Sequence, residues 1–162
     1  MNEQNRYARS FGEQCTPRAL LTGALGAVII TASSMYVALR MGALPWPTIF
    51  VAILSLTVLK ALGGTNLNEI NVTHTAMSAG GMVAGGLAFT LPGLWMLDAN
   101  AAVDTLPLLA VTVGGAVLGV VFTALIRRHF VEVEQLPFLM GIAASETVLA
   151  GDSGGGKAKL LF

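Results

Sequence analysis

The sequence predicts an all-α integral membrane protein with four transmembrane helices, followed by a short re-entrant or interfacial helix. Hydrophobic residues make up 54% of the 162 residues and charged residues only 11%, against roughly 25% charged in a soluble domain. Four stretches contain no charged residue, over 19–39, 41–59, 70–97 and 105–126. Each is close to or longer than the roughly 20 residues with which a helix crosses a bilayer. These observations exclude a soluble globule, a disordered chain and a nucleic-acid-binding module.

The first two helices are expected on either side of a short connection. The first should cover 19–39, with Pro17 just before it, where a helix start tolerates proline. The second should begin near the Pro-Trp-Pro sequence at 45–47, because proline suits a first turn and an indole suits the membrane interface. It should run to about Leu62, where two glycines end it.

The third and fourth helices are expected beyond a polar segment at 65–75. The third should cover 76–97, and the Pro92-Gly93 pair predicts a kink or an early stop near its end. After a short loop, the fourth should cover 106–126 and end at two arginines. The chain thus divides into an N-terminal segment (1–18), a four-helix region (19–128) and a final region (129–162).

The basic residues predict how these helices are oriented. Six lie on one side of the expected membrane and Arg40 alone on the other; the six are Arg6, Arg9, Arg18, Lys60, Arg127 and Arg128. The positive-inside rule therefore places the N-terminus in the cytoplasm of a multi-pass protein of the cell (inner or plasma) membrane. The net charge is zero, so no overall field indicates a polyanionic partner such as nucleic acid.

The final region differs from the four spans before it. Residues 135–145 are uncharged but too few to cross a bilayer, which favours a re-entrant or interfacial helix. The glycines over 151–156 predict a flexible break. The chain then turns apolar again at 157–162, as though another hydrophobic segment were beginning.

Small residues recur one helical turn apart in three of the expected helices. The pairs are Gly23 with Ala27, Gly81 with Gly85, and Gly115 with Gly119. In lipid this spacing lets helix backbones approach closely, so helix packing is the first interpretation. The alternative is that these glycines permit motion or line a substrate path.

A polar face is expected at the entrance of the third helix. Asn71, His74, Thr75 and Ser78 recur at helical spacing and share one side. Because polar groups at membrane depth need partners, this face should point toward protein or a wet cavity. Capping with interfacial solvation remains open beside a substrate-facing role.

Glu146 follows the uncharged run of the final region. If that run enters the protein, an ionised carboxylate there costs roughly 2.5–3.5 kcal/mol without compensation. A carboxylate kept at such a position is suited to carry a proton or to bind a cation. The alternative is a surface helix on which Glu146 is solvated.

Enzymatic, metal and redox chemistry find little support. Cys15 is the only cysteine, which excludes an intrachain disulfide, and neither His74 nor His129 has other ligands at a zinc-like spacing. We expect no metal and no cofactor. Without a nucleotide-binding glycine loop, an ATP-driven pump is not supported.

The sequence Gly-Asp-Ser-Gly-Gly at 151–155 imitates the nucleophile segment of chymotrypsin-like proteases. His74, Asp98 and Ser153 even follow that family's chain order. However, the triad needs a double β-barrel to bring its members together, and the predicted topology places Asp98 across the membrane from the other two. We therefore do not expect an enzyme.

Two segments resemble the oligopeptide transporter (OPT) family. Residues 135–152, QLPFLMGIAASETVLAGD, are similar to its signature, in which Leu-Pro-(Phe/Tyr)-Pro leads through glycine to a glutamate and then to Ala-Gly and an acid. Residues 71–81 are similar to its Asn-(Ile/Val)-x-x-Thr-x-x-Ser-Ala-Gly-Gly run. The resemblance extends over about 16–162 and includes 155–161, which resemble bacterial members. Leu139 departs from the common second proline, and His74 from a common glutamine.

The resemblance implies secondary active transport of small peptides, or of metal complexes with peptide-like chelators, generally with protons. Members of the family are several times longer, so a partial transporter fold is expected here, as the N-terminal portion. The implied substrate path includes the polar face over 71–78 and the segment with Pro137, Gly141 and Glu146.

The implied partners are the lipid bilayer, the solute, protons, and either the rest of the transporter or another copy of the chain. A different class of function stays open beside transport. The chain could be a small non-transporting scaffold or assembly subunit of the membrane, or an inactive fragment of a split gene. Uptake of a labelled peptide or metal chelate would separate these alternatives.

Overall fold

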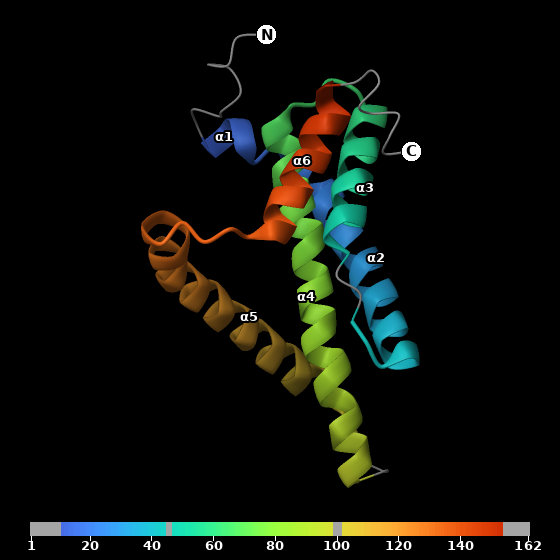
Figure 1. The fold of residues 1–162 in the computed structure, drawn as a ribbon. Helices are drawn as coiled ribbons and strands as arrows, with labels where there is room; N and C mark the ends of the chain where they lie inside the picture. Colours follow the sequence, from blue (N-terminus) through green and yellow to red (C-terminus); the bar gives the residue numbers. More distant parts are fainter. Residues whose placement is uncertain (1–10, 45–46, 99–101, 154–162) are drawn as a thin grey trace.

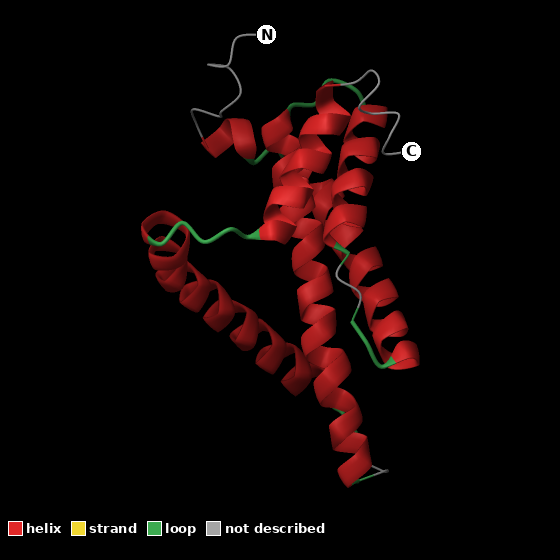
Figure 2. Cartoon of the chain, in the orientation of Figure 1, coloured by secondary structure: helices red, strands yellow, loops and turns green. Residues whose placement is uncertain are grey.

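The computed structural model describes residues 11–44, 47–98 and 102–153. Within these ranges the chain is helical and contains no strand (Figures 1 and 2). The elements are α1 (Phe11–Gln14), α2 (Pro17–Met41), α3 (Thr48–Ala61), α4 (Leu67–Leu97), α5 (Thr105–Arg127), the π-helical turn η2 (Arg128–Val133) and α6 (Leu139–Ser153). The predictions for Arg6, Arg9, Pro45, Trp46 and 154–162 lie outside the described residues.

Three helical segments are long and apolar enough to cross a membrane, namely Pro17–Met41, Leu67–Leu97 and Thr105–Val133. The predicted all-α membrane fold is therefore confirmed. The second expected helix is shorter than predicted, because α3 has only 14 residues, or about 21 Å at the usual helical rise. After α3 the chain turns through Gly63 and Gly64, which both have positive φ angles, of 77° and 57°.

Helix α4 begins earlier than predicted, at Leu67, so much of the expected polar segment is helical. Asn66 caps this start, since its side chain accepts a hydrogen bond from the backbone N–H of Glu69. Pro92 lies inside α4, which continues to Leu97, so the early stop does not occur. With 31 residues, α4 is about 46 Å long, and its polar first turns extend beyond a 30 Å hydrocarbon core.

The core of the bundle is the contact between α2 and α4, and it is built from small residues. The buried positions of α2 form one stripe of Ala19, Gly23, Gly26, Ile30, Ser34 and Ala38. A methyl group on Gly80 of α4 would lie 2.6 Å from the carbonyl oxygen of Ala27. The two backbones are therefore nearly in contact, as expected where small residues replace hydrophobic driving force in lipid.

Helices α3 and α6 complete the bundle. Val51 of α3 packs with Ile30 and Met77, while Leu56, Leu59 and Ile70 form a second cluster that Val148 of α6 joins. Gly151 near the end of α6 lies so close to Leu56 that a methyl group there would be 2.5 Å from its Cδ2. Figure 1 shows α6 lying along α3 and α4.

Helix α6 differs in position from the predicted helix at 135–145. The chain from Gln135 to Phe138 is a connection outside any helix, and α6 then covers Leu139–Ser153. Pro137 suits this connection because it donates no backbone hydrogen bond. The predicted flexible break does not begin at Gly151, since residues 151–153 form the last turn of α6.

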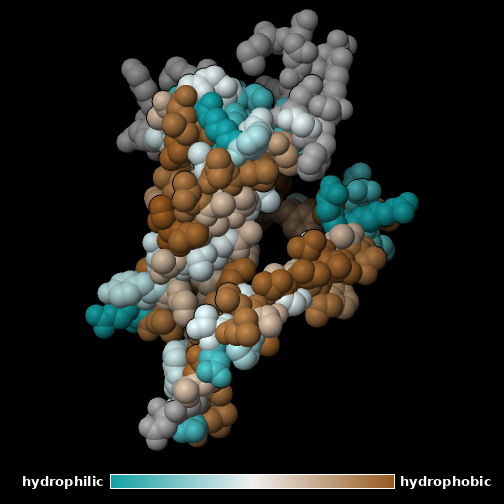
Figure 3. Space-filling view, turned by 180° about the vertical axis from the view of Figure 1, so that it is seen from behind, coloured by the Kyte–Doolittle hydropathy of each residue, from teal (hydrophilic) through white to brown (hydrophobic). Residues whose placement is uncertain are grey.

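Helix α5 diverges from the bundle and approaches α4 only near one end (Figure 1). None of its residues is buried. Figure 3 shows hydrophobic residues over α5 and the sides of the bundle, with hydrophilic residues gathered toward helix ends. The apolar surface of α5 must therefore be covered by lipid or by other protein.

Candidate functional site

Four helix ends meet at one end of the bundle, where the N-termini of α2 and α4 lie beside the C-termini of α3 and α6 (Figure 1). Helix ends carry backbone groups without intrahelical partners, as well as the partial charges of the helix dipole. The charged side chains of the bundle satisfy several of these groups. They form two sites, one around Glu69 and one around Lys60.

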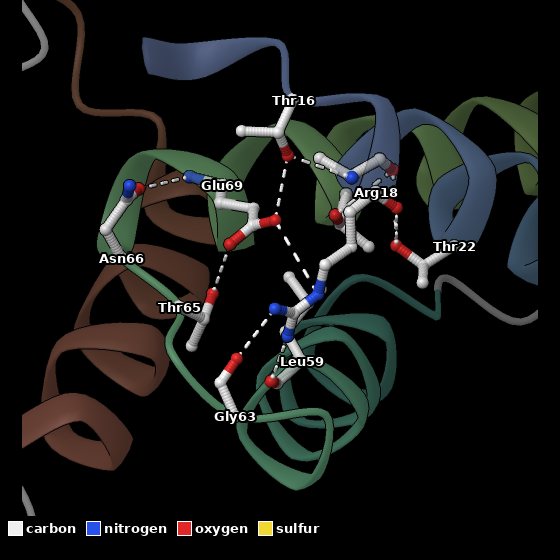
Figure 4. Close-up of polar contacts among 10 residues, drawn as sticks. Thr16, Arg18, Thr22, Leu59, Gly63, Thr65, Asn66 and Glu69 are labelled. Carbon is white, nitrogen blue, oxygen red and sulfur yellow. Dashed lines mark hydrogen bonds and ion pairs between the residues drawn. The ribbon is translucent and has the colours of Figure 1, made fainter.

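We define the Arg18–Glu69 cluster as Thr16, Arg18, Thr65 and Glu69 with the carbonyl groups of Leu59 and Gly63 (Figure 4). Glu69 is almost fully buried, with 4% of its surface exposed. Its carboxylate accepts one hydrogen bond from the Thr16 hydroxyl and one from the Thr65 hydroxyl, each of 2.8 Å. A buried carboxylate requires such partners, because an unpaired charge is costly to bury.

Arg18 reaches from α2 to the C-terminus of α3. Its two terminal nitrogens donate hydrogen bonds of 2.6 Å to the Gly63 carbonyl and 2.8 Å to the Leu59 carbonyl. A cation at this position satisfies free carbonyl groups and complements the negative end of the helix dipole. Arg18 therefore holds the end of α3 against the start of α2.

The charge pair between Arg18 and Glu69 is not closed by a hydrogen bond. The Arg18 Nε atom lies 3.8 Å from Glu69 Oε1, and this nitrogen is buried without a hydrogen-bond partner. Leaving a buried donor unsatisfied costs about 1–3 kcal/mol. The cluster thus includes one unfavourable feature among otherwise well-formed contacts.

The cluster also joins the caps of two helices. Thr16 is the N-cap of α2, where its hydroxyl accepts a bond of 3.1 Å from the Ala19 N–H and donates to Glu69. Glu69 lies in the first turn of α4, behind the cap formed by Asn66. A single carboxylate therefore connects the starts of α2 and α4, and Arg18 connects both to α3.

Lys60 ties α6 to α3 at the same end of the bundle. Its ammonium group donates a hydrogen bond of 2.7 Å to the Gly151 carbonyl and lies 3.6 Å from Asp152 Oδ1. Both side chains are partly exposed, so the ion pair itself contributes little and the bond to the helix end contributes more.

The predicted polar face of α4 divides into two parts. His74 and Ser78 are half-buried, and His74 Nε2 lies 3.2 Å from the Thr48 carbonyl oxygen and 3.5 Å from the Ser78 hydroxyl. Asn71 and Thr75 are exposed, and the Thr75 hydroxyl donates to the Asn71 carbonyl within the helix. The structure therefore brings only two of these four side chains together.

Glu146 is exposed on the side of α6 away from the buried positions Ala144 and Gly151. Within the described part of the chain its carboxylate has no hydrogen bond or ion pair. Pro137, in the connection before α6, and Gly141, in the first turn of α6, are exposed as well.

The glycines predicted to pack helices lie in two different environments. A methyl group on Gly81 would be 3.3 Å from Pro47 Cγ, and one on Gly85 would be 2.6 Å from Leu44 Cδ2. Both glycines thus lie against the connection between α2 and α3. Gly115 and Gly119 of α5 face open space, with no atom within 4 Å of an added methyl group.

The described ranges contain no group of three or more His, Cys, Asp or Glu that could hold a metal ion. His74 lies near the start of α4 and Asp98 directly follows its end, about 36 Å apart at the helical rise. This separation contradicts a catalytic triad that includes both residues.

The sequence pattern alone does not identify the Arg18–Glu69 cluster. Glu69 falls within the polar segment at 65–75 and is the sole acidic residue between positions 14 and 97. That isolation was the available signal, because a single carboxylate between two membrane spans usually has a specific partner. Its pairing with Arg18 depends on the tertiary fold.

These features define a class: a multi-pass helical membrane protein with tightly packed helices, uncovered apolar faces and few charges, mostly at helix ends. A sequence model described as OPT oligopeptide transporter protein matches residues 14–162. The chain therefore belongs to the OPT family, and the resemblance seen in the sequence is confirmed.

A curated relative supports the same family. The protein described as "Putative oligopeptide transporter" from Haemophilus influenzae (strain ATCC 51907 / DSM 11121 / KW20 / Rd) is 32% identical over 122 residues. The match covers 75% of this chain and 19% of the relative, so the chain spans about a fifth of its length. No solved structure matches the chain.

Proposed function

We propose that this chain is the N-terminal part of a secondary active transporter, coupled to protons, that moves small peptides or metal-chelate complexes across the membrane. The observation that carries the proposal is the match of the OPT family over residues 14–162. The three long apolar helices and the uncovered surface of α5 support it, because they suit one portion of a larger helical membrane protein.

The proposed path lies beside two exposed polar features. One is the face of α4 with Asn71 and Thr75, and the other is the side of α6 with Glu146. Glu146 precedes Asp152 by six residues, or about 9 Å along the helix, so it lies farther from the end of α6 than the contact of Asp152 with Lys60, at a depth that we propose is within the membrane. A carboxylate facing lipid at such a depth is costly, whereas one facing a wet path can carry a proton.

The uncovered surface of α5 indicates where a further protein partner would pack. Helix α5 has no buried residue, and its small-residue face around Gly115 and Gly119 is open. We propose that the rest of the transporter, or another copy of the chain, packs on this face. The N-terminus is proposed to lie on the cytoplasmic side of the cell membrane. Arg18 donates to the carbonyl groups of Leu59 and Gly63, so it lies at the same end of the bundle as Lys60.

Uptake measurements test this function against the rival one of a non-transporting scaffold. Cells that lack their own peptide uptake would express the chain alone, or together with the coding region downstream of it. Labelled di- and tripeptides and metal-chelate complexes would then be supplied with and without a proton gradient. We expect gradient-dependent uptake when the chain is expressed together with the downstream region, a combination that we call the joined transporter. Uptake equal to the empty-vector control in every case would favour the scaffold.

A further inference from the structure

The Arg18–Glu69 cluster lacks one hydrogen bond that it could form, between Arg18 Nε and the Glu69 carboxylate. Native proteins leave few buried polar atoms without partners, and such atoms often mark a strained or functional position. Here the Arg18 Nε is buried without a hydrogen-bond partner, although an acceptor, Glu69 Oε1, lies only 3.8 Å away. A small movement of the guanidinium group would make this bond.

Arg18 has two alternative sets of acceptors within reach. In the structure it donates to the Leu59 and Gly63 carbonyl groups at the end of α3. The Glu69 carboxylate is the second set, and the planar fork of a guanidinium suits a carboxylate in a bidentate pair. The Arg18 side chain retains 33% exposure, which leaves it room to turn.

The acceptor on α3 is itself on a segment suited to move. Gly63 and Gly64 form the turn between α3 and α4 with φ angles of 77° and 57°, a conformation that glycine enters and leaves at little cost. Beyond this turn, Glu69 is held by two neutral hydroxyl groups. Hydrogen bonds with a neutral donor are weaker than those in which donor and acceptor are both charged.

We propose that the Arg18–Glu69 cluster is a latch. Arg18 exchanges between the carbonyl groups at the end of α3 and the Glu69 carboxylate, and this exchange holds or releases the end of α3 relative to α2 and α4. The inference rests on the proposed transport function, because a latch matters only if this end of the protein opens.

Hydrogen–deuterium exchange of the segment 59–65 tests the latch in the full chain in membranes. The backbone N–H groups of Leu62 and Gly63 are bonded to the carbonyl groups of Val58 and Lys60, so their exchange reports release of the turn. Arg18→Gln removes the guanidinium group that holds the carbonyl groups of Leu59 and Gly63. We expect exchange to become faster by roughly tenfold, because the loss of one charged hydrogen bond has about this effect. Glu69→Gln replaces the competing carboxylate with a neutral amide that accepts through one oxygen only and cannot form the bidentate pair. Arg18 should then stay on α3, and exchange should become slower than in the wild type.

These opposite signs distinguish a latch from a fixed polar cap. In a fixed cap both substitutions loosen the turn, so faster exchange in Glu69→Gln would overturn the proposal, as would unchanged exchange in both variants. If Arg18→Gln fails to accumulate, Arg18→Lys keeps the charge but loses the fork, and faster exchange is again expected.

Two controls separate local release from loss of fold. Glu146→Gln changes an exposed carboxylate outside the cluster and should leave the exchange of 59–65 unchanged. The segment 26–38 of α2, which packs against α4, should exchange at the wild-type rate in every variant. Because the measurement needs no substrate, its outcome is distinguishable from that of the uptake assay. Unchanged exchange in both variants with intact uptake overturns the latch alone, whereas absent uptake overturns the proposed function.

Discussion

At the scale of single residues, Gly80 decides how closely α2 and α4 approach. A methyl group there would lie 2.6 Å from the Ala27 carbonyl oxygen and 3.0 Å from Ala27 Cα. Backbone atoms cannot turn aside as a flexible side chain can, so an added atom forces the two helices apart. Gly86 of the same helix has no atom within 4 Å of an added methyl group and provides a matched control.

We therefore predict that Gly80→Ala destabilises the protein by about 1–3 kcal/mol through overpacking. Gly86→Ala should be neutral, or stabilising by up to about 1 kcal/mol, because alanine favours a helix more than glycine does. Thermal unfolding of both purified variants in detergent measures the difference. Equal unfolding temperatures for the two would contradict the close contact.

This residue also shows what spacing alone can predict. Small residues one turn apart indicate a packing face, but the glycines at 80, 81 and 85 are spread over about 140° around the helix axis. Which glycine faces α2 depends on how α4 is rotated about its own axis, and residue spacing alone does not give this rotation. The structure places Gly80 against α2, and Gly81 and Gly85 against the connection around Leu44 and Pro47.

At the scale of elements, α6 depends on Lys60 for its attachment to α3. Lys60 donates to the Gly151 carbonyl at the end of α6, where an unpaired carbonyl and the negative end of the dipole meet. The close approach of Gly151 to Leu56 belongs to the same contact.

Lys60→Met keeps the length of the side chain and removes this hydrogen bond, so it should weaken the docking of α6 by about 1–3 kcal/mol. Limited proteolysis with chymotrypsin, which cleaves beside aromatic and leucine residues, measures exposure of Leu139–Ser153. We expect faster cleavage in α6 and unchanged cleavage in α2. Arg127→Met, which removes an exposed pair with Glu132, is the control, and equal effects of the two variants would refute the role of Lys60.

The boundaries of elements were harder to predict than their existence. The charge-free stretches located α2, α3, α4 and α5, because length and hydrophobicity decide membrane insertion. The polarity of residues 65–75 predicts a start of α4 at 76, whereas the Asn66 cap lets the helix begin at Leu67. The position of α6 was missed because its attachment to α3 depends on tertiary contacts.

At the scale of the whole molecule, the orientation in the membrane is open to a direct measurement. In a Cys15→Ser background, single cysteines would replace Gly64, in the turn before α4, and Asp104, the N-cap residue of α5. A membrane-impermeant maleimide applied to intact cells should label the cysteine at 104 and reach the one at 64 only after permeabilisation, because basic residues stay inside. The reverse pattern would contradict a cytoplasmic N-terminus.

The all-α fold and the OPT family could be predicted from the sequence, because both depend on local patterns such as the run at 135–152. The Arg18–Glu69 cluster could not, since its members come from distant parts of the chain and meet only when α2, α3 and α4 pack. The path residues stay proposals, with Glu146 the most specific of them.

The most direct measurement of the central claim is proton-driven solute uptake by the joined transporter in vesicles, comparing Glu146→Gln with Glu132→Gln. Both carboxylates are exposed, but only Glu146 lies on the proposed path, and loss of a proton-carrying group is expected to cost about 10²-fold or more in rate. We predict that Glu146→Gln abolishes gradient-driven uptake while Glu132→Gln keeps the wild-type rate. Wild-type uptake in Glu146→Gln, or no uptake by the unmodified protein, would contradict the account.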